Sequence, residues 1–255
     1  MRVLSREQVR RLDQDAVQQL GLPSLLLMEN AARGLSAAVR QVLSPPGSAA
    51  GVGTGAAAAA GVLGRIVIAA GAGNNGGDGL ALARLLAAEG VPAEVLLFRC
   101  GRSLSPDAAA NLGFLQRAGL LVSECGPQQS GAIFAGLSAA DLIVDALLGT
   151  GVRGAPQEPL SLVIQQINAS AARVLSVDLP SGLDCDLGTA AGDCVRADLT
   201  VTFAAMKRGF LLEESRKWTG AVQVCHIGIP AGWSGWPVAE ETGLVADPNT
   251  ELTQY

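Results

Sequence analysis

The sequence predicts an α/β protein with three layers, α/β/α, around a mostly parallel central sheet. Two observations lead to this fold class. Strand-length runs of apolar residues alternate with segments of helical spacing, which is typical of a parallel sheet. The runs are also continuously apolar and not alternating, as expected of strands buried on both faces. They cover residues 65–70, 91–98, 141–145, 172–177, 197–203 and 221–227.

A helical lead-in precedes the sheet. Ser5 and Gln8 form a capping box for a first helix that ends at Gly21 and Pro23. Residues 24–43 have the spacing of a second helix, in which Glu29 and Asn30 interrupt an apolar run. Because buried polar groups need partners, these two residues either face solvent or line a site.

Composition and spacing predict the remaining segments. Residues 44–61 are rich in Ser, Pro, Gly, Val and Ala, which predicts a flexible low-complexity insertion. Helices are expected over 80–88, 105–118, 130–139 and 158–169, and a short strand over 120–122. Residues 1–230 are expected to form one domain, and 231–255 a C-terminal surface tail without clear periodicity.

A glycine-rich segment joins the first strand of the sheet to the helix after it. Gly71–Gly79 reads Gly-Ala-Gly-Asn-Asn-Gly-Gly-Asp-Gly, and its first six residues satisfy the G-x-G-x-x-G pattern of Rossmann-like dinucleotide sites. Free backbone N–H groups and the positive end of a helix suit a phosphate here. The negative charge of Asp78 would repel a phosphate, so Asp78 either stabilises the helix N-terminus or faces a site.

The residues at the end of the second strand argue against an ordinary dehydrogenase. The carboxylate that binds a ribose is expected there, but the sequence reads Leu96-Leu-Phe-Arg99, and Glu94 lies at the wrong end of the strand. A P-loop kinase is disfavoured too, because the Gly-Lys-Ser/Thr ending is absent.

Composition narrows the function further. A net charge of −5 argues against a nucleic-acid partner. The sequence contains no apolar run of bilayer-crossing length and none typical of a signal peptide, so we expect no membrane association and a cytoplasmic location. Five scattered cysteines favour a reducing compartment and argue against structural zinc. With His226 the only histidine, acid–base chemistry is expected from carboxylates.

Three strands end in loops of similar polar character, at 71–79, 145–154 and 178–182. The carboxyl ends of parallel strands share one edge, which is where open α/β sheets bind ligands. The loops should therefore bring together Asn74, Asn75, Asp78, Asp145, Thr150, Arg153, Asp178 and Ser181. The oxygens of Asn75, Asp145 and Ser181 suit a hard monovalent or divalent cation. Turn formation is the alternative role for both carboxylates, Asp145 and Asp178.

Five motifs follow one another along the chain: Leu27-Met-Glu-Asn-Ala-Ala32, Gly73-Asn-Asn-Gly-Gly-Asp-Gly79, Asp145-Ala-Leu-Leu-Gly-Thr-Gly151, Val177-Asp-Leu-Pro-Ser-Gly182 and Thr202-Phe-Ala-Ala-Met-Lys-Arg-Gly209. Together and in this order they resemble one family, the NAD(P)H-hydrate epimerases, or YjeF N-terminal domain proteins. The resemblance covers about Leu4 to Pro230. It implies a Rossmann-like fold and interconversion of the R and S forms of hydrated NADH or NADPH, a repair of nicotinamide nucleotides.

The resemblance also implies roles for particular residues. The hydrated dinucleotide would be held by Asn74, Asn75, Gly76, Gly77, Asp78, Gly149, Thr150, Gly151, Val152, Arg153, Gly154 and Asp178. A potassium ion would be bound by Asn75, Asp145 and Ser181, and Lys207 would lie near the rim. The S-specific dehydratase domain fused to many relatives does not fit into this length, so a separate dehydratase is the expected functional partner. A homodimer is compatible with the resemblance.

The chemistry of inversion suggests one catalytic residue. The hydrated ring carbon inverts either by loss of its hydroxyl to an iminium or by reversible ring opening, and both routes need a general acid that becomes a base. Asp178 is the candidate for both roles. The alternative is a non-catalytic nucleotide-binding or interaction module of the same fold. Such a module could lose Asp178, Asn75 or the glycines, and their presence favours an enzyme.

Overall fold

The computed structural model describes residues 1–44, 64–126, 130–151 and 153–238. Seven parallel strands form the central sheet in the order β4-β3-β2-β5-β6-β7-β9. The strands are β2 (Ile66–Gly71), β3 (Ala93–Phe98), β4 (Val122–Glu124), β5 (Leu142–Ala146), β6 (Arg173–Val177), β7 (Leu199–Phe203) and β9 (Ala221–Cys225). The predicted α/β class and parallel sheet are confirmed.

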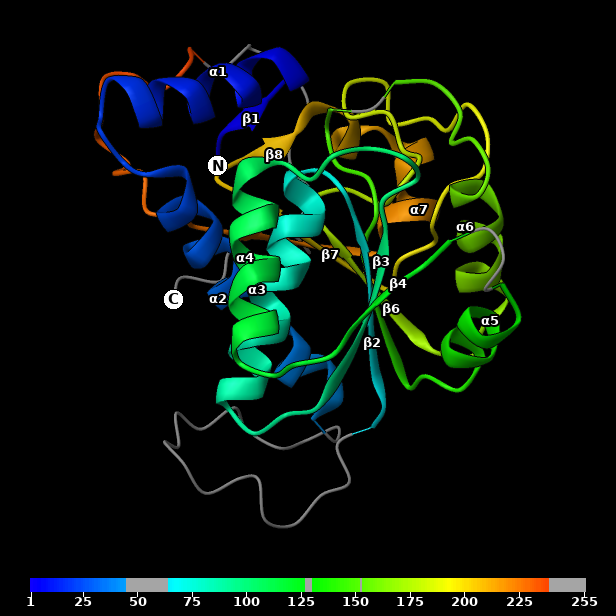
Figure 1. The fold of residues 1–255 in the computed structure, drawn as a ribbon. Helices are drawn as coiled ribbons and strands as arrows, with labels where there is room; N and C mark the ends of the chain where they lie inside the picture. The colour runs from blue at the N-terminus through cyan, green and yellow to red at the C-terminus, as the bar shows by residue number, and fades with distance from the viewer. Residues whose placement is uncertain (45–63, 127–129, 152, 239–255) are drawn as a thin grey trace.

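Helices cover both faces of the sheet (Figure 1). On one face lie α2 (Ser24–Leu43), α3 (Asn74–Ala88) and α4 (Pro106–Arg117), and on the other α5 (Ser130–Ser138) and α6 (Leu160–Ala169). Every residue of β2 is buried: Ile66 and Ile68 pack towards α2–α4, whereas Val67 and Ala69 pack towards α5 and α6. This two-sided burial explains why the strands are continuously apolar.

The lead-in helix α1 (Arg6–Gln18) begins with the predicted capping box, and its N-terminus lies directly after the first strand of a small second sheet. In that sheet β1 (Val3–Leu4) pairs in parallel with β8 (Met206–Lys207), with Leu4 opposite Lys207. Short helical turns follow β8 at Arg208–Leu211 and Glu213–Ser215, and then α7 (Arg216–Thr219). The β1–β8 pairing, which the sequence did not suggest, fixes the start of α1 against the carboxyl-end half of the chain.

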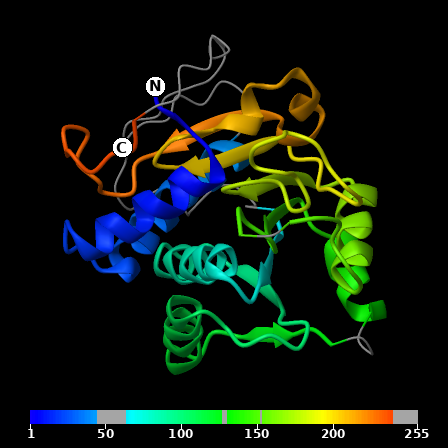
Figure 2. The ribbon, with the colours of Figure 1, turned by 90° about the horizontal axis from the view of Figure 1, so that it is seen from above.

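The segment after β9, at the start of the expected surface tail, packs against α1 (Figure 2). Trp233 and Trp236 pack on the apolar cluster that α1 shares with Ile227 and Ile229. Arg2 stacks over the Trp236 ring, 4.0 Å from its centroid, and Gln8 donates to the carbonyl of Val238 at 3.1 Å. Apolar burial and these polar contacts hold residues 230–238 in place, and 239–255 lie outside the described residues.

Two further differences from the predictions concern element bounds. Helix α3 begins at Asn74, so that most of the glycine-rich segment is helix and not loop. The short fourth strand lies at Val122–Glu124 instead of 120–122. The expected insertion lies almost wholly outside the described residues. Among the helices that are described, none has both the length and the apolar character needed to cross a bilayer.

Candidate active site

The glycines of the first motif allow three backbone segments to meet at the carboxyl edge of the sheet. A Cβ on Gly71 would lie 1.9 Å from the carbonyl oxygen of Leu147, and one on Gly76 would lie 1.8 Å from that of Gly71. No side chain fits at these distances. The two glycines are therefore needed for close packing of α3 on the end of β2, and of that end on the loop after β5, in addition to any binding of phosphate.

Asp145 is the centre of a buried polar cluster where β5 and β6 end. Its Oδ1 accepts hydrogen bonds from the Ser181 hydroxyl at 2.5 Å and the Leu147 N–H at 3.3 Å. Its Oδ2 accepts from the Ser181 N–H and the Ser176 hydroxyl, both at 2.9 Å. Burial raises the pKa of Asp145, and these hydrogen bonds offset part of the rise. The predicted meeting of Asp145 and Ser181 is confirmed.

Asn75 completes this cluster from the first turn of α3. Its side-chain N–H donates to the carbonyl of Leu148 at 3.1 Å, and the N–H of Leu148 donates to the Ser181 hydroxyl at 2.9 Å. The Asn75 Oδ1 is buried and has no hydrogen-bond partner among the described residues. An unpartnered amide oxygen beside a buried carboxylate is a donor set that fits a hard cation.

Asp178 follows β6 in the left-handed region, with φ of 62°. Its Oδ1 lies 2.9 Å from the ammonium of Lys207 and accepts from the Thr202 hydroxyl at 3.1 Å and the Phe203 N–H at 3.4 Å. Its Oδ2 has no hydrogen bond or ion pair within the described residues. The carboxylate is therefore oriented through one oxygen, and the other is left to a ligand.

Lys207 is not at the rim, as the resemblance had suggested, but fully buried. Its ammonium donates to the carbonyl of Phe203 at 3.0 Å as well as pairing with Asp178. A charged lysine tolerates such burial only when its charge and its donors are matched. The residue is held by β8, which is why its depth could not be predicted from a local motif.

Asp78 lies in the second turn of α3. Gly73 is the N-cap of this helix, so the alternative that Asp78 stabilises the N-terminus is wrong. Asp78 is buried and forms no hydrogen bond with any residue the structure describes. Burial raises its pKa well above the usual value, and the charges of Asp178, Asp13 and Asp107 raise it further.

Asp13 of α1 is an acidic residue that the sequence interpretation did not consider, and the charges of Lys207 and Asp178 act on it. Protein atoms around the carboxyl raise its pKa to about 6, and the charge of Lys207 opposes this while that of Asp178 adds to it. Nevertheless Asp13 stays open to solvent. Its position on the polar side of α1 carries no local signal, because the start of α1 is fixed near Lys207 only by the pairing of β1 with β8.

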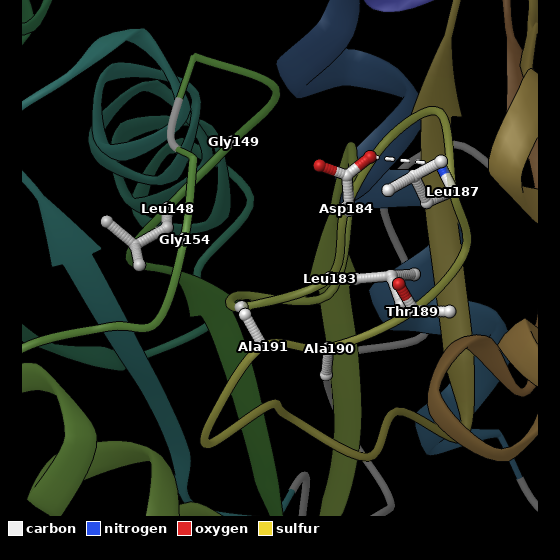
Figure 3. Close-up of a pocket in the computed structure, with 10 residues that line it drawn as sticks. Leu148, Gly149, Gly154, Leu183, Asp184, Leu187, Thr189, Ala190 and Ala191 are labelled. Atoms are coloured by element: carbon white, nitrogen blue, oxygen red, sulfur yellow. Dashed lines mark hydrogen bonds between the residues drawn. The ribbon is translucent and has the colours of Figure 1, made fainter.

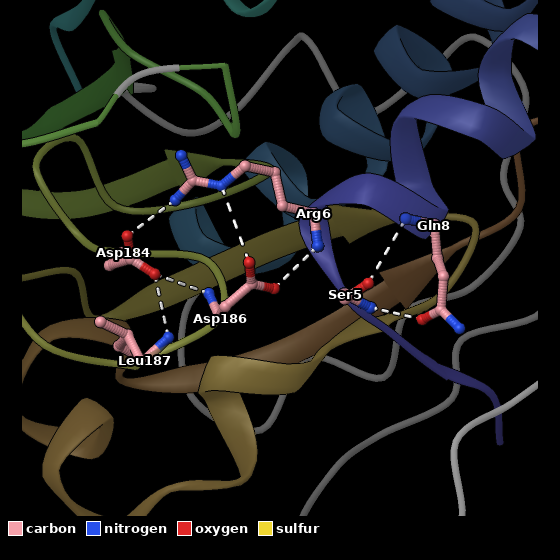
Figure 4. A network of polar contacts seen from close by, with 6 residues as sticks. All are labelled: Ser5, Arg6, Gln8, Asp184, Asp186 and Leu187. Atoms are coloured by element: carbon pink, nitrogen blue, oxygen red, sulfur yellow. Dashed lines mark hydrogen bonds and ion pairs between the residues drawn. The ribbon is translucent and has the colours of Figure 1, made fainter.

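A cavity of about 270 Å³ lies beside the Asp145 cluster, between the loops 148–154 and 182–191 (Figure 3). Its lining is mostly small and apolar, with Leu148, Leu183 and Ala190 among its residues. Asp184 is held at its border by an ion pair with Arg6 at 2.8 Å (Figure 4). Burial acts to raise the pKa of Asp184, but backbone N–H donors and Arg6 outweigh it, so the pKa falls below its usual value.

The remaining candidates lie around this edge with different exposure. Gly149 packs on Asn75, since a Cβ added to it would lie 3.2 Å from the Asn75 Cβ. Asn74, Gly151, Arg153 and Gly154 are exposed, Thr150 is half-buried, Gly76 and Gly77 are buried, and Val152 lies outside the described residues. Their roles in binding remain predictions.

Three residues that the sequence left open are outside the site. Glu29 forms ion pairs with Arg33 and Arg84, and Asn30 donates to the carbonyl of Ile227 at 3.0 Å. Glu29 therefore links α2 to α3, and Asn30 links α2 to the segment after β9. His226 is exposed just beyond β9, which agrees with a surface role.

Comparisons with known proteins agree with this geometry. A family model described as "YjeF-related protein N-terminus" matches residues 24–209. An NAD(P)H-hydrate epimerase of Pirellula staleyi is 37% identical over 230 residues, which cover 90% of this chain and 93% of that protein. A bifunctional NAD(P)H-hydrate repair enzyme Nnr of Moorella thermoacetica is 36% identical over 90% of this chain but only 41% of its own length.

A solved structure supports the fold. The crystal structure of the yeast protein YNL200c matches 82% of this chain and 83% of its own, with a TM-score of 0.69 and 23% identity. The family model covers well over half of the chain, and the P. staleyi relative is matched along nearly its whole length. The chain therefore belongs to the family of YjeF-related N-terminal domain proteins.

Proposed function

We propose that this chain is an NAD(P)H-hydrate epimerase, an isomerase that interconverts the R and S forms of hydrated NADH and NADPH. Relatives that bear this name are 34–37% identical over most of the chain. The structural observation that best supports this reaction is the environment of the Asp178 carboxylate. Lys207, the Thr202 hydroxyl and the Phe203 N–H orient one of its oxygens, and the other oxygen has no partner among the described residues.

Asp178 would act as the general acid and base. Inversion requires a bond to the hydrated ring carbon to break and re-form, by loss of the hydroxyl or by ring opening. The lone pair of the ring nitrogen drives departure of the hydroxyl, so that the carboxyl has only protons to move. The ammonium of Lys207 compensates the carboxylate charge and holds the group towards the ligand.

A potassium ion is proposed as a cofactor in the cluster of Asn75, Asp145 and Ser181. The unpartnered Asn75 Oδ1 and the buried charge of Asp145 support this. The positive charge of the ion would compensate that carboxylate and attract the phosphates of a dinucleotide. The residues 74–78 and 149–154, together with Asp178, would hold the substrate around it.

The reaction would have a partner enzyme. The Moorella relative is named as a bifunctional repair enzyme, and this chain spans 41% of its length. We infer that an S-specific dehydratase acts on the product of this domain. A cytoplasmic location and a homodimer remain proposals of the same kind.

Pure R-hydrate of NADH, incubated with the protein, tests the function. The expected result is conversion to the S form, followed by chromatography, faster than the spontaneous rate and dependent on potassium. Asp178→Asn should lower kcat by about 10²–10⁴-fold. Asp193→Asn, which changes a half-buried carboxylate that accepts a hydrogen bond from Gln165, is the matched control and should leave the rate unchanged.

Two results would contradict the proposal. If the wild-type protein does not exceed the spontaneous rate but binds the hydrate, the chain is a nucleotide-binding module. If Asp178→Asn retains the wild-type rate and affinity, the epimerase assignment stands but the catalytic role of Asp178 is wrong.

A further inference from the structure

Residues 182–191 form a hairpin that is one wall of the cavity (Figure 3). Leu183 and Ala190 pair across it in an antiparallel bridge. Its tip packs closely on the turn after β8, since a Cβ added to Gly188 would lie 2.4 Å from the carbonyl oxygen of Gly209. The hairpin is therefore held by its own pairing and by a second segment of the chain.

A third contact fixes the tip of the hairpin to helix α1 (Figure 4). The guanidinium of Arg6 is buried and pairs with Asp184 Oδ2 at 2.8 Å. Asp184 Oδ1 accepts from the backbone N–H groups of Asp186 and Leu187, both at 2.9 Å. Arg6 also donates its own backbone N–H to Asp186 at 2.8 Å. The position of Leu187 therefore depends on an ion pair between segments 178 residues apart.

The lining of the cavity suits a flat, uncharged group. Among the described residues that line it, only Asp184 is charged, and both oxygens of that carboxylate already have donors. A carboxylate at the border would repel a phosphate. Pockets for drug-sized ligands have volumes of about 300–1,000 Å³. A cavity of about 270 Å³ can therefore take one ring system but not a whole dinucleotide.

Leu187 is the feature that points to an occupant. It lines the cavity but is 61% exposed, whereas Leu148 and Leu183 on the same lining are buried. A ring seated in the cavity would cover Leu187 and remove apolar surface from water. Gly149 and Gly154 also line the cavity, and they belong to the loop expected to hold the dinucleotide.

We propose that the cavity binds the adenine base of the hydrated dinucleotide against Leu187, and that Arg6 is the positioning residue for this contact. The inference rests on the proposed function. The hydrated ring must meet Asp178, which is not among the described residues that line the cavity. The base at the other end of the substrate is therefore the group left to fill it. Adenine is flat and uncharged at neutral pH, as the lining requires.

The test compares the R-hydrates of NADH and of reduced nicotinamide mononucleotide, which has the same reactive ring but no adenylate. Leu187→Ala should raise KM for hydrated NADH about 10-fold, with kcat within about threefold of wild type. KM for the mononucleotide hydrate should not change. Arg6→Met should give the same pattern, and Arg6→Lys, which keeps a positive charge beside Asp184, should restore part of the affinity.

Two matched controls separate the contact from general effects of substitution. Leu121→Ala changes a leucine that is 90% exposed and lies outside the cavity. Arg11→Met breaks an ion pair with Asp15 on the same helix as Arg6. Both should behave as the wild type with both substrates. Calorimetry with AMP measures binding without turnover, and Leu187→Ala should bind AMP about 10-fold more weakly than the wild type.

Several outcomes would overturn the proposal. A rise in KM that is equal for the two substrates would assign the cavity to the nicotinamide end, and an unchanged KM or AMP affinity of Leu187→Ala would exclude the contact. A wild-type KM of Arg6→Met would exclude its positioning role. Should thermal unfolding show that Arg6→Met does not fold, Asp184→Asn decides, since it keeps an acceptor for the Leu187 N–H but loses the ion pair. Its KM should rise for hydrated NADH alone, and a wild-type KM would overturn the role of Arg6. A wild type that binds AMP but does not epimerise would instead overturn the proposed function.

Discussion

Replacing Lys207 by methionine tests whether the buried ion pair holds the site together. Lys207→Met keeps the length of the side chain but removes the charge that lies 2.9 Å from Asp178 Oδ1. At this separation the attraction is about 6 kcal/mol for an effective dielectric constant of 20. Breaking a buried pair by removing one partner costs about 3–5 kcal/mol, because the other charge remains.

The lower end of that range applies here. The Lys207 side chain is 1% exposed but that of Asp178 is 15% exposed, so water can reach part of the abandoned carboxylate. We expect Lys207→Met to lower the free energy of unfolding by about 3 kcal/mol, and the melting temperature by roughly 6–12 °C for a protein of this size.

Denaturation in urea, followed by circular dichroism, measures the effect. The double variant Lys207→Met/Asp178→Asn removes both charges and should recover to within about 1 kcal/mol of wild type, since an uncharged pair carries no desolvation cost. Asparagine also tolerates the positive φ of residue 178. A single variant that unfolds at the wild-type midpoint with an unchanged m value would refute this reasoning.

Three further predictions concern the cluster and the glycine motif. Ser181→Ala removes the hydroxyl that donates to Asp145 and accepts from the backbone N–H of Leu148. The free energy of unfolding should fall by roughly 2–4 kcal/mol, measured by denaturation in urea, and an unchanged midpoint would contradict this. The raised pKa of Asp78 means that the folded state binds its proton more tightly, so stability falls as pH rises above about 4, the usual value in an unfolded chain. The melting temperature of Asp78→Asn should therefore rise relative to that of the wild type as the pH increases from 4 to 8. A difference in melting temperature that does not change with pH would exclude this. Gly76→Ala should lose more than about 4 kcal/mol, whereas Gly73→Ala, with no atom within 4 Å of its added Cβ, should stay within about 1 kcal/mol.

Much of the sheet could be predicted because its strands are buried on both faces. The run at 65–70 became β2, all of it buried, and 221–227 contains β9. The proximity of Asp145 and Ser181 could be predicted from the sequence, because parallel strands end at one edge of the sheet. The start of α3 could not be predicted, because tertiary packing overrides the low helix propensity of glycine at positions 76, 77 and 79.

The contribution of α1 to the site was beyond the reach of local patterns. Two-residue strands such as β1 and β8 have no periodicity to detect. Their pairing places Leu4, just before α1, opposite Lys207, and the partners are about 200 residues apart in the chain. The packing of Trp233 and Trp236 on α1 depends on the same long-range arrangement.

This arrangement has a consequence for biosynthesis. The first strand and helix leave the ribosome early, but the strand that pairs with Val3 and Leu4 is synthesised about 200 residues later. At 5–20 residues per second the interval is roughly 10–40 s, during which the apolar face of α1 can pack on Leu27 and Ala31 of α2 but not yet on Ala205, Ile227 and Ile229. Strands β2 to β7 are synthesised in this time, whereas β8 and then β9, the edge strand of the central sheet, follow last. Newly made chains should therefore pass through a stage at which they are partly folded, inactive and vulnerable to proteolysis at the N-terminus.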